Sequence, residues 1–217
     1  MSQELSKRIL SSIILIPVSI FFIIKGDTFF NFFITICFFI TAFEWHMMTK
    51  DKIYNLFGLI FLIISFYSIY HLRNQFEADF TYLLFVAIVC VSTDIGGYVF
   101  GNFFKGPTLT KISPKKTYSG MIGSFFLSII FINFFLNISY LNNSITFTKE
   151  LLIFVILISA VSQLGDILIS YFKRKSKIKD TGKIIPGHGG LLDRIDGMIF
   201  AFPFSYVVIS TNIIKLL

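Results

Sequence analysis

The stretch FTYLLFVAIVCVSTDIGGYVFGNFF, from Phe80 to Phe104, is 25 residues long and contains one charged side chain, Asp94. A helix needs about 20 apolar residues to cross the ~30 Å hydrocarbon core of a bilayer. The stretch is long enough to do so, and it predicts a membrane helix. Gly97 and Gly101 lie one turn apart within it, which predicts close approach of a neighbouring helix backbone.

Six further apolar runs lie on either side of this stretch, at residues 9–24, 28–45, 53–70, 121–136, 151–172 and 197–216. They predict an all-α polytopic membrane protein with about seven transmembrane helices. The connections are too short to hold a separate soluble domain. Residues 1–217 are therefore predicted to form a single integral-membrane domain, with N-terminal spans in 1–78 and a catalytic part in 79–217.

The composition supports the same class of protein. Of 217 residues, 55% are hydrophobic and 14% are charged, whereas soluble domains carry about 25% charged residues. The net charge of +7 favours anionic lipid headgroups or phosphates as partners. Nucleic acid is not expected as a partner, because the aromatic residues lie in apolar runs and not among the basic ones.

Fifteen of the 19 Lys and Arg residues fall on one side of the predicted membrane. They lie in the N-terminus and in alternate loops, at Lys7, Arg8, Lys50, Lys52, Lys105, Lys111, Lys115, Lys116, Lys173, Arg174, Lys175, Lys177, Lys179, Lys183 and Arg194. By the positive-inside rule this side is cytoplasmic. The N-terminus and the two most basic loops are therefore predicted to face the cytoplasm.

Acids within the predicted spans are the first functional signal. A charge at the depth of Asp94 or Asp166 costs at least ~2.5 kcal/mol on insertion scales, so a functional interpretation is favoured over a structural one. Glu44 differs, because it lies beside Trp45 and His46 near a helix end. We interpret Glu44 as a structural interfacial anchor.

A second signal is the segment PGHGGLLDRIDG at residues 186–197. If it is helical, the spacing of Asp193 and Asp196 places both carboxylates on one face, where they could hold Mg²⁺ bridged to phosphate oxygens. His188, several glycines and a run of Lys and Arg share the same side of the membrane. These are the parts required for phosphoryl or nucleotidyl transfer.

From Ser92 onward the chain resembles the phosphatidate cytidylyltransferases, also called CDP-diacylglycerol synthases. The family signature is followed at Ser170-Tyr171-Phe172-Lys173-Arg174, Lys179-Asp180, Pro186, His188-Gly189-Gly190 and Asp193-Arg194-Ile195-Asp196. Upstream elements are Ser113-Pro114-Lys115-Lys116-Thr117, and Asp94-Ile95-Gly96 followed by Tyr98. The chain departs from the pattern at Ile169, where many relatives have an acid, and at Ser119, where many have Glu.

The resemblance implies transfer of CMP from CTP to phosphatidic acid, giving CDP-diacylglycerol and pyrophosphate in phospholipid biosynthesis. Implied catalytic residues are Asp166, Asp193, Asp196, Lys173, Arg194 and His188. Implied substrate-binding residues are Ser113, Lys115, Lys116, Thr117, Ser170, Arg174, Lys179, Asp180, Gly189 and Gly190. Implied metal ligands are Asp94, Asp166, Asp193 and Asp196, for Mg²⁺ and a second cation such as K⁺.

Other expectations concern partners and location. CTP, phosphatidic acid and membrane lipid are the expected partners, and a homodimer is left open. The active site is expected at the cytoplasmic side. The sidedness of the charges and the absence of a transit-like leader predict a bacterial cytoplasmic (inner) membrane protein.

Three other functions share some of these features. A CTP-dependent polyprenol or lipid kinase would transfer the γ-phosphate instead. A proton-coupled transporter would explain acids in spans but not the motif that runs from His188 to Asp196. A CDP-alcohol phosphatidyltransferase is excluded, because its motif continues with further acids and none follows Asp196.

Overall fold

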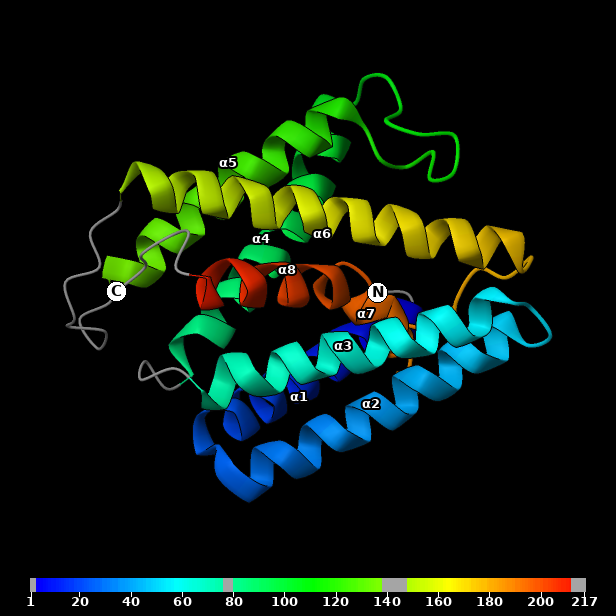
Figure 1. Ribbon diagram of the computed structural model, residues 1–217. Helices are drawn as coiled ribbons and strands as arrows, with labels where there is room; N and C mark the ends of the chain where they lie inside the picture. Colours follow the sequence, from blue (N-terminus) through cyan, green and yellow to red (C-terminus); the bar gives the residue numbers. More distant parts are fainter. Residues whose placement is uncertain (1–2, 76–79, 138–147, 212–217) are drawn as a thin grey trace. The chain divides into compact units, whose positions relative to one another are not determined.

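The computed structural model describes residues 3–75, 80–137 and 148–211, and over these residues it contains eight α-helices and two isolated β-bridges. The helices are α1 Gln3–Lys25, α2 Asp27–Thr49, α3 Tyr54–Asn74, α4 Thr81–Phe104, α5 Tyr118–Asn137, α6 Lys149–Lys175, α7 Leu192–Ile195 and α8 Met198–Ser210. Figure 1 shows them in sequence colours. The predicted all-α class is confirmed for the described part of the chain.

Five helices, α2 to α6, are long and apolar enough to cross a membrane. Many of their large apolar side chains are exposed, such as Phe57 and Phe103 at 67% and 79%. Lipid tails are as apolar as these side chains, so such faces are stable in a bilayer. The apolar part of α1, Leu10–Lys25, and helix α8 are shorter, and the predicted last run, 197–216, continues past the described residues.

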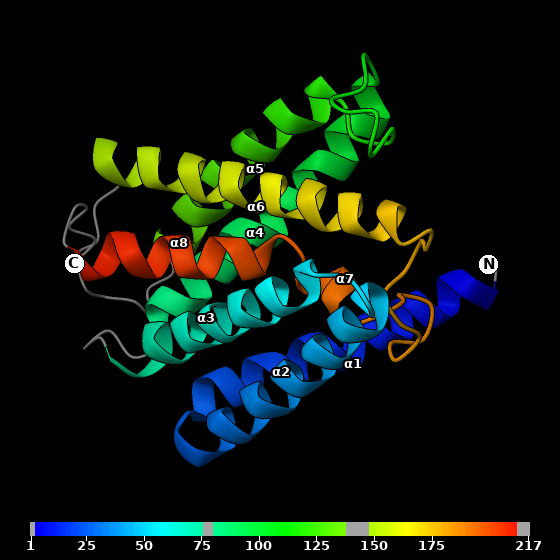
Figure 2. The same ribbon diagram turned by 45° about the vertical axis from the view of Figure 1, so that its right-hand side comes forward.

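The chain divides into two compact units, the first made of Met1–Tyr82 and Phe172–Asp196. In it α1 and α2 form a hairpin through Gly26, whose φ of 70° suits glycine, and α3 lies beside α2 (Figures 1 and 2). Gly58 of α3 lies so close to the Trp45 ring that a Cβ there would overlap it. The indole Nε1 donates to the carbonyl oxygen of Asn55 at 3.0 Å.

The end of α6, the loop that follows it and α7 also belong to this first unit. The Phe172 ring packs against the rings of Trp45 and Tyr54, with both centroid distances at 5.2 Å. The sequence assigned all catalytic motifs to residues 79–217. In the structure, residues 172–196 of this part group with the three N-terminal helices.

The second unit contains Leu83–Tyr171 and Gly197–Leu217, and so most of α4, α5, α6 and α8. Close backbone approach between α4 and α5 is confirmed, because a Cβ on Gly120 would lie 2.7 Å from the carbonyl oxygen of Gly97. A buried polar seam joins three of these helices. Thr93 Oγ1 donates to Ser159 Oγ at 2.7 Å, and Ser124 Oγ donates to the Thr93 carbonyl at 2.7 Å.

Candidate active site

The segment between α6 and α7, residues 176–191, carries much of the predicted signature, and we call it the signature loop. A tight turn shapes its second half, where the His188 N–H donates to the Ile185 carbonyl at 3.0 Å. Pro186 and Gly187 occupy the central positions, and Gly187 has a φ of 76°. Proline followed by a glycine of positive φ is typical of a type II turn. The turn reverses the chain just before α7.

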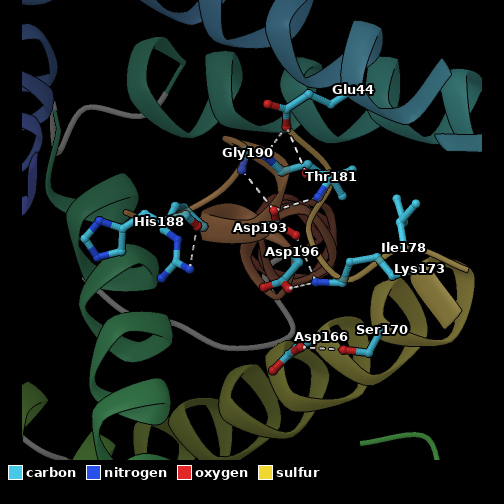
Figure 3. A network of polar contacts seen from close by, with 12 residues as sticks. Glu44, Asp166, Ser170, Lys173, Ile178, Thr181, His188, Gly190, Asp193 and Asp196 are labelled. Carbon is cyan, nitrogen blue, oxygen red and sulfur yellow. Dashed lines mark hydrogen bonds and ion pairs between the residues drawn. The ribbon is translucent and has the colours of Figure 1, made fainter. Parts of the chain in front are cut away.

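Asp193 is the centre of the first unit's polar network, which Figure 3 shows from close by. Its Oδ2 accepts hydrogen bonds from the backbone N–H groups of Thr181 at 2.8 Å and Gly190 at 2.9 Å. Its Oδ1 accepts a hydrogen bond from Lys173 Nζ at 3.0 Å. Bonds to a charged acceptor are about twice as strong as neutral ones. Asp193 therefore ties Thr181 and Gly190 of the signature loop to Lys173 on α6.

Lys173 is shared by both acids of the D-x-x-D motif. Its ammonium lies 3.0 Å from Asp193 Oδ1 and 3.6 Å from Asp196 Oδ2. The prediction that the two carboxylates share one face is confirmed, since both reach the same cation. The three side chains are 11%, 4% and 14% exposed, so the surrounding water screens them weakly.

Glycine is required at position 189 for two reasons. The φ of Gly189 is +90°, and a Cβ on it would lie 2.8 Å from Asp193 Oδ2. The family resemblance assigns Gly189 to substrate binding. The structure adds an internal reason, because the backbone here also lies against a carboxylate of the protein itself.

Glu44, on α2, is a residue of this network that the sequence analysis did not assign to the site. It accepts hydrogen bonds from Leu191 N at 3.0 Å, Leu192 N at 2.8 Å and Thr181 Oγ1 at 3.2 Å (Figure 3). The residue is 2% exposed. Its interpretation as a structural residue agrees with these contacts, but its location at the membrane interface is wrong, because its carboxylate is buried against the signature loop. The signal that could have identified it is the one used for Asp94, an acid within an apolar run.

His188 is held at both its ring and its backbone. Its Nδ1 lies 2.7 Å from Ser11 Oγ on α1, and its carbonyl accepts a hydrogen bond from Arg194 at 3.0 Å. Ser11 Oγ also lies 3.2 Å from the Pro186 carbonyl oxygen, to which it can donate. Ser11 is a second residue that the sequence did not reveal, since a serine in an apolar run carries no functional signal.

The second unit contains a separate ion pair between the loop that joins α4 to α5 and helix α6. Lys116 Nζ lies 2.5 Å from Asp166 Oδ2 and donates to the Gln163 carbonyl at 3.5 Å. Ser170 Oγ donates to Asp166 Oδ1 at 3.3 Å (Figure 3). Two elements that the sequence proposed separately, the Pro-Lys-Lys-Thr motif and the intramembrane Asp166, are therefore in contact.

The loop that carries Lys116 is closed by its own hydrogen bonds. Leu109 N donates to the Lys116 carbonyl at 2.7 Å. Thr117 is the N-cap of α5, because its Oγ1 accepts from Gly120 N at 3.1 Å. Ser119, where the chain departs from the family pattern, donates through its hydroxyl to the Lys105 carbonyl. Its side chain therefore helps to fasten the loop.

The other predicted residues differ in how far they are buried. Asp94 is exposed on α4, Ser113 is half-buried, and exposed positions are also occupied by Lys115, Arg174, Lys179, Asp180 and Arg194. The role of Asp94 as a metal ligand stays a prediction. Ile169, the other departure from the family pattern, is 2% exposed. It is therefore a core residue and leaves no acid at that position.

The predicted Mg²⁺ site requires acids of the first unit that lie close together. Within the described residues, no three His, Cys, Asp or Glu side chains lie together as a metal site of their own. Mg²⁺ is usually bound by one or two carboxylates together with waters and substrate phosphates. Asp193 and Asp196 supply such a pair, and they already converge on one cation, the Lys173 ammonium. This donor set fits a Mg²⁺ ion that is shared with a phosphate ligand.

Comparison with known proteins gives a consistent result. A model of the cytidylyltransferase family matches residues 50–212. The phosphatidate cytidylyltransferase of Rickettsia typhi is 35% identical over 206 residues, which cover 93% of this chain and 90% of that protein. The enzyme of the same name from Rickettsia felis is 34% identical over 215 residues, covering 95% and 92%. That of Bacillus subtilis is 33% identical over 152 residues, covering 70% and 55%.

Proposed function

Because the chain belongs to the cytidylyltransferase family, we propose that it transfers the cytidylyl group of CTP to phosphatidic acid. The products are CDP-diacylglycerol and pyrophosphate. The observation that carries this proposal is the pair of carboxylates, Asp193 and Asp196, that share the Lys173 ammonium. A lipid substrate also suits a chain with five helices of membrane length.

The reaction requires little proton transfer. A phosphate oxygen of phosphatidic acid attacks the α-phosphorus of CTP, and the bond from that phosphorus to the α,β-bridging oxygen breaks as pyrophosphate leaves. A phosphate monoester has its second pKa at about 6 and is mostly dianionic at neutral pH, so no strong general base is needed. The main obstacle is the repulsion between two polyanions.

The basic side chains proposed for the site would reduce this repulsion. Lys173 and Lys116 already lie against carboxylates, and with Lys115 and Arg194 they supply positive charge for the triphosphate. Asp193 and Asp196 would hold Mg²⁺, which when bound neutralises charge on the phosphate oxygens. Asp166 and Asp94, in the second unit, stay predicted ligands for Mg²⁺ or for a second cation such as K⁺.

We place the protein in a bacterial cytoplasmic membrane, with its N-terminus and active site on the cytoplasmic side. The support is the asymmetry of the 19 basic residues and the bacterial source of the relatives. CTP is a cytoplasmic nucleotide, so a site on that side has direct access to it. Whether the chain forms a homodimer is tested by its mass in detergent.

The proposal is tested with purified protein, phosphatidic acid and CTP labelled either in cytidine or at the γ-phosphate, with and without Mg²⁺. The expected result is cytidine label in the lipid fraction, release of pyrophosphate and dependence on Mg²⁺. Transfer of the γ-phosphate label to lipid with release of CDP would instead identify a lipid kinase. Absence of both reactions would show that phosphatidic acid is not the acceptor and would reject the proposed function.

Ser11→Ala is expected to slow turnover by about threefold to tenfold, since one hydrogen bond contributes about 1 kcal/mol and 1.36 kcal/mol corresponds to a tenfold rate change. Without the hydroxyl, the His188 ring loses its hydrogen bond to Ser11 on α1. The measurement is kcat at saturating CTP and phosphatidic acid. Ser11→Thr keeps the hydroxyl and serves as the control. Equal kcat for Ser11→Ala and the wild type would show that this contact does not contribute.

A further inference from the structure

The carboxylate of Glu44 lies against two nearby segments of the chain. One is Thr181-Gly182, within the signature loop, and the other is Gly190 to Leu192, where the loop joins α7. Glu44 Oε2 accepts from Thr181 Oγ1 at 3.2 Å and from Leu192 N at 2.8 Å, while Oε1 accepts from Leu191 N at 3.0 Å. One side chain of α2 therefore closes the signature loop on itself.

Asp193 binds the same two segments through different atoms. The Thr181 backbone N–H and the Gly190 N–H donate to Asp193 Oδ2 at 2.8 Å and 2.9 Å. Thr181 thus donates its N–H to one carboxylate and its hydroxyl to the other (Figure 3). The position of Asp193 relative to the loop depends on both acids.

The glycines of the loop fit the Glu44 carboxylate sterically. A Cβ on Gly182 would lie 2.6 Å from Glu44 Oε1, and a Cβ on Gly190 would lie 2.5 Å from Oε2. Real Cβ atoms essentially never approach so closely, so a larger residue at either position would displace the carboxylate. Glycine at these two positions and glutamate at position 44 form one packing unit.

We infer that Glu44 is a positioning residue for the cytidylyl transfer proposed above: its buried carboxylate fixes the signature loop and thereby orients Asp193. It is 2% exposed and has three donors from the protein, so it acts through the loop and not on the substrate. It lies outside residues 50–212, which the family model matches. The inference gives the N-terminal helices a part in catalysis and rests on the proposed function.

Glu44→Gln is the sharpest test, because it keeps the size of the side chain and replaces one acceptor oxygen by an N–H donor. That donor would face other N–H donors, as those of Leu191 and Leu192 both point at the carboxylate. Misplacement of catalytic groups by about 1 Å can slow a reaction about a hundredfold. We expect kcat to fall roughly thirty- to a hundredfold, with the KM for phosphatidic acid changed less than about threefold. Glu44→Asp keeps the charge and should recover part of the loss.

A second readout needs no substrate. Lys177, Lys179 and Lys183 are exposed in the signature loop, so trypsin should cleave the loop of Glu44→Gln faster than that of the wild type, while the rest of the chain keeps its wild-type pattern. The proteolysis experiment tests whether Glu44 fixes the signature loop even if the wild type shows no cytidylyl transfer. If Glu44→Gln does not fold, Thr181→Val replaces it as the test. This variant removes one of the three hydrogen bonds to Glu44, so it should shift kcat and tryptic cleavage in the same direction by a smaller amount.

The matched control is Glu150→Gln, the same chemical change at an exposed position on α6. It should keep wild-type kcat and wild-type cleavage. The inference is overturned if Glu44→Gln keeps more than half of the wild-type kcat. It is also overturned if cleavage in Glu44→Gln rises equally across the whole chain, because Glu44 would then support the fold in general and not the loop.

Discussion

Asp193→Asn is expected to lower the rate of cytidylyl transfer by at least about a thousandfold, while the protein still folds and inserts in the membrane. The change removes the negative charge that faces Lys173 and the proposed Mg²⁺. It leaves one side-chain oxygen that can still accept from the N–H groups of Thr181 and Gly190. The loop should therefore keep its shape, and the loss should appear in kcat measured at saturating CTP.

The control for this variant is Asp51→Asn, an exposed position with a φ of 63°, which asparagine accepts readily. It should show wild-type turnover. A rate within about threefold of the wild type for Asp193→Asn, at saturating Mg²⁺, would remove Asp193 from the set of metal ligands. Fast tryptic cleavage of its signature loop would show that the loss comes from loop disorder instead.

Local patterns were sufficient to predict most of the helices and one part of the site. Each apolar run longer than about 18 residues predicts a helix by itself, because the bilayer leaves no other way to satisfy the backbone. The i, i+3 spacing of Asp193 and Asp196 also carries its own geometry. Both features depend only on residues close in sequence, and both are seen in the structure.

The contacts that hold the signature loop could not be predicted in this way. Glu44 lies 147 residues before Leu191, and Ser11 lies 177 residues before His188. No periodicity links positions so far apart. The acid at position 44 was visible in the sequence, but two of its three partners are backbone N–H groups, which almost every residue type carries and which a sequence pattern therefore does not reveal.

The sequence predicts about seven membrane helices, whereas five of the described helices are long and apolar enough to cross a membrane. Helix length explains part of this difference. Helix α8 has 13 residues, which at 1.5 Å per residue is about 20 Å, shorter than the ~30 Å core of a bilayer. The apolar run at 197–216 is long enough by hydropathy alone. Pro203 lies inside α8, and the described helix ends at Ser210, so the run and the helix do not coincide.

The second large effect is expected at the ion pair between Lys116 and Asp166 in the second unit. Its loss should lower activity much more than stability. Lys116 and Asp166 are partly buried, at 24% and 27% exposed, so their ion pair lies between exposed pairs, which typically contribute 0 to about 1 kcal/mol to stability, and fully buried ones. Lys116→Met should therefore lower the melting temperature only modestly. It should lower kcat/KM for CTP about a hundredfold, because a cation proposed to bind the triphosphate is lost.

The double variant Lys116→Met/Asp166→Asn distinguishes a binding role from a structural one. Removal of Lys116 alone leaves Asp166 without its cation, whereas the double variant removes both charges, so any stability lost in the single variant should return. If Lys116 serves only to neutralise Asp166, activity should return with it. We expect activity to stay at least as low as in the single variant, since both residues are proposed to act on the substrates. Lys111→Met, an exposed lysine of the same loop, should leave activity and stability unchanged and shows that loss of one positive charge alone is not the cause.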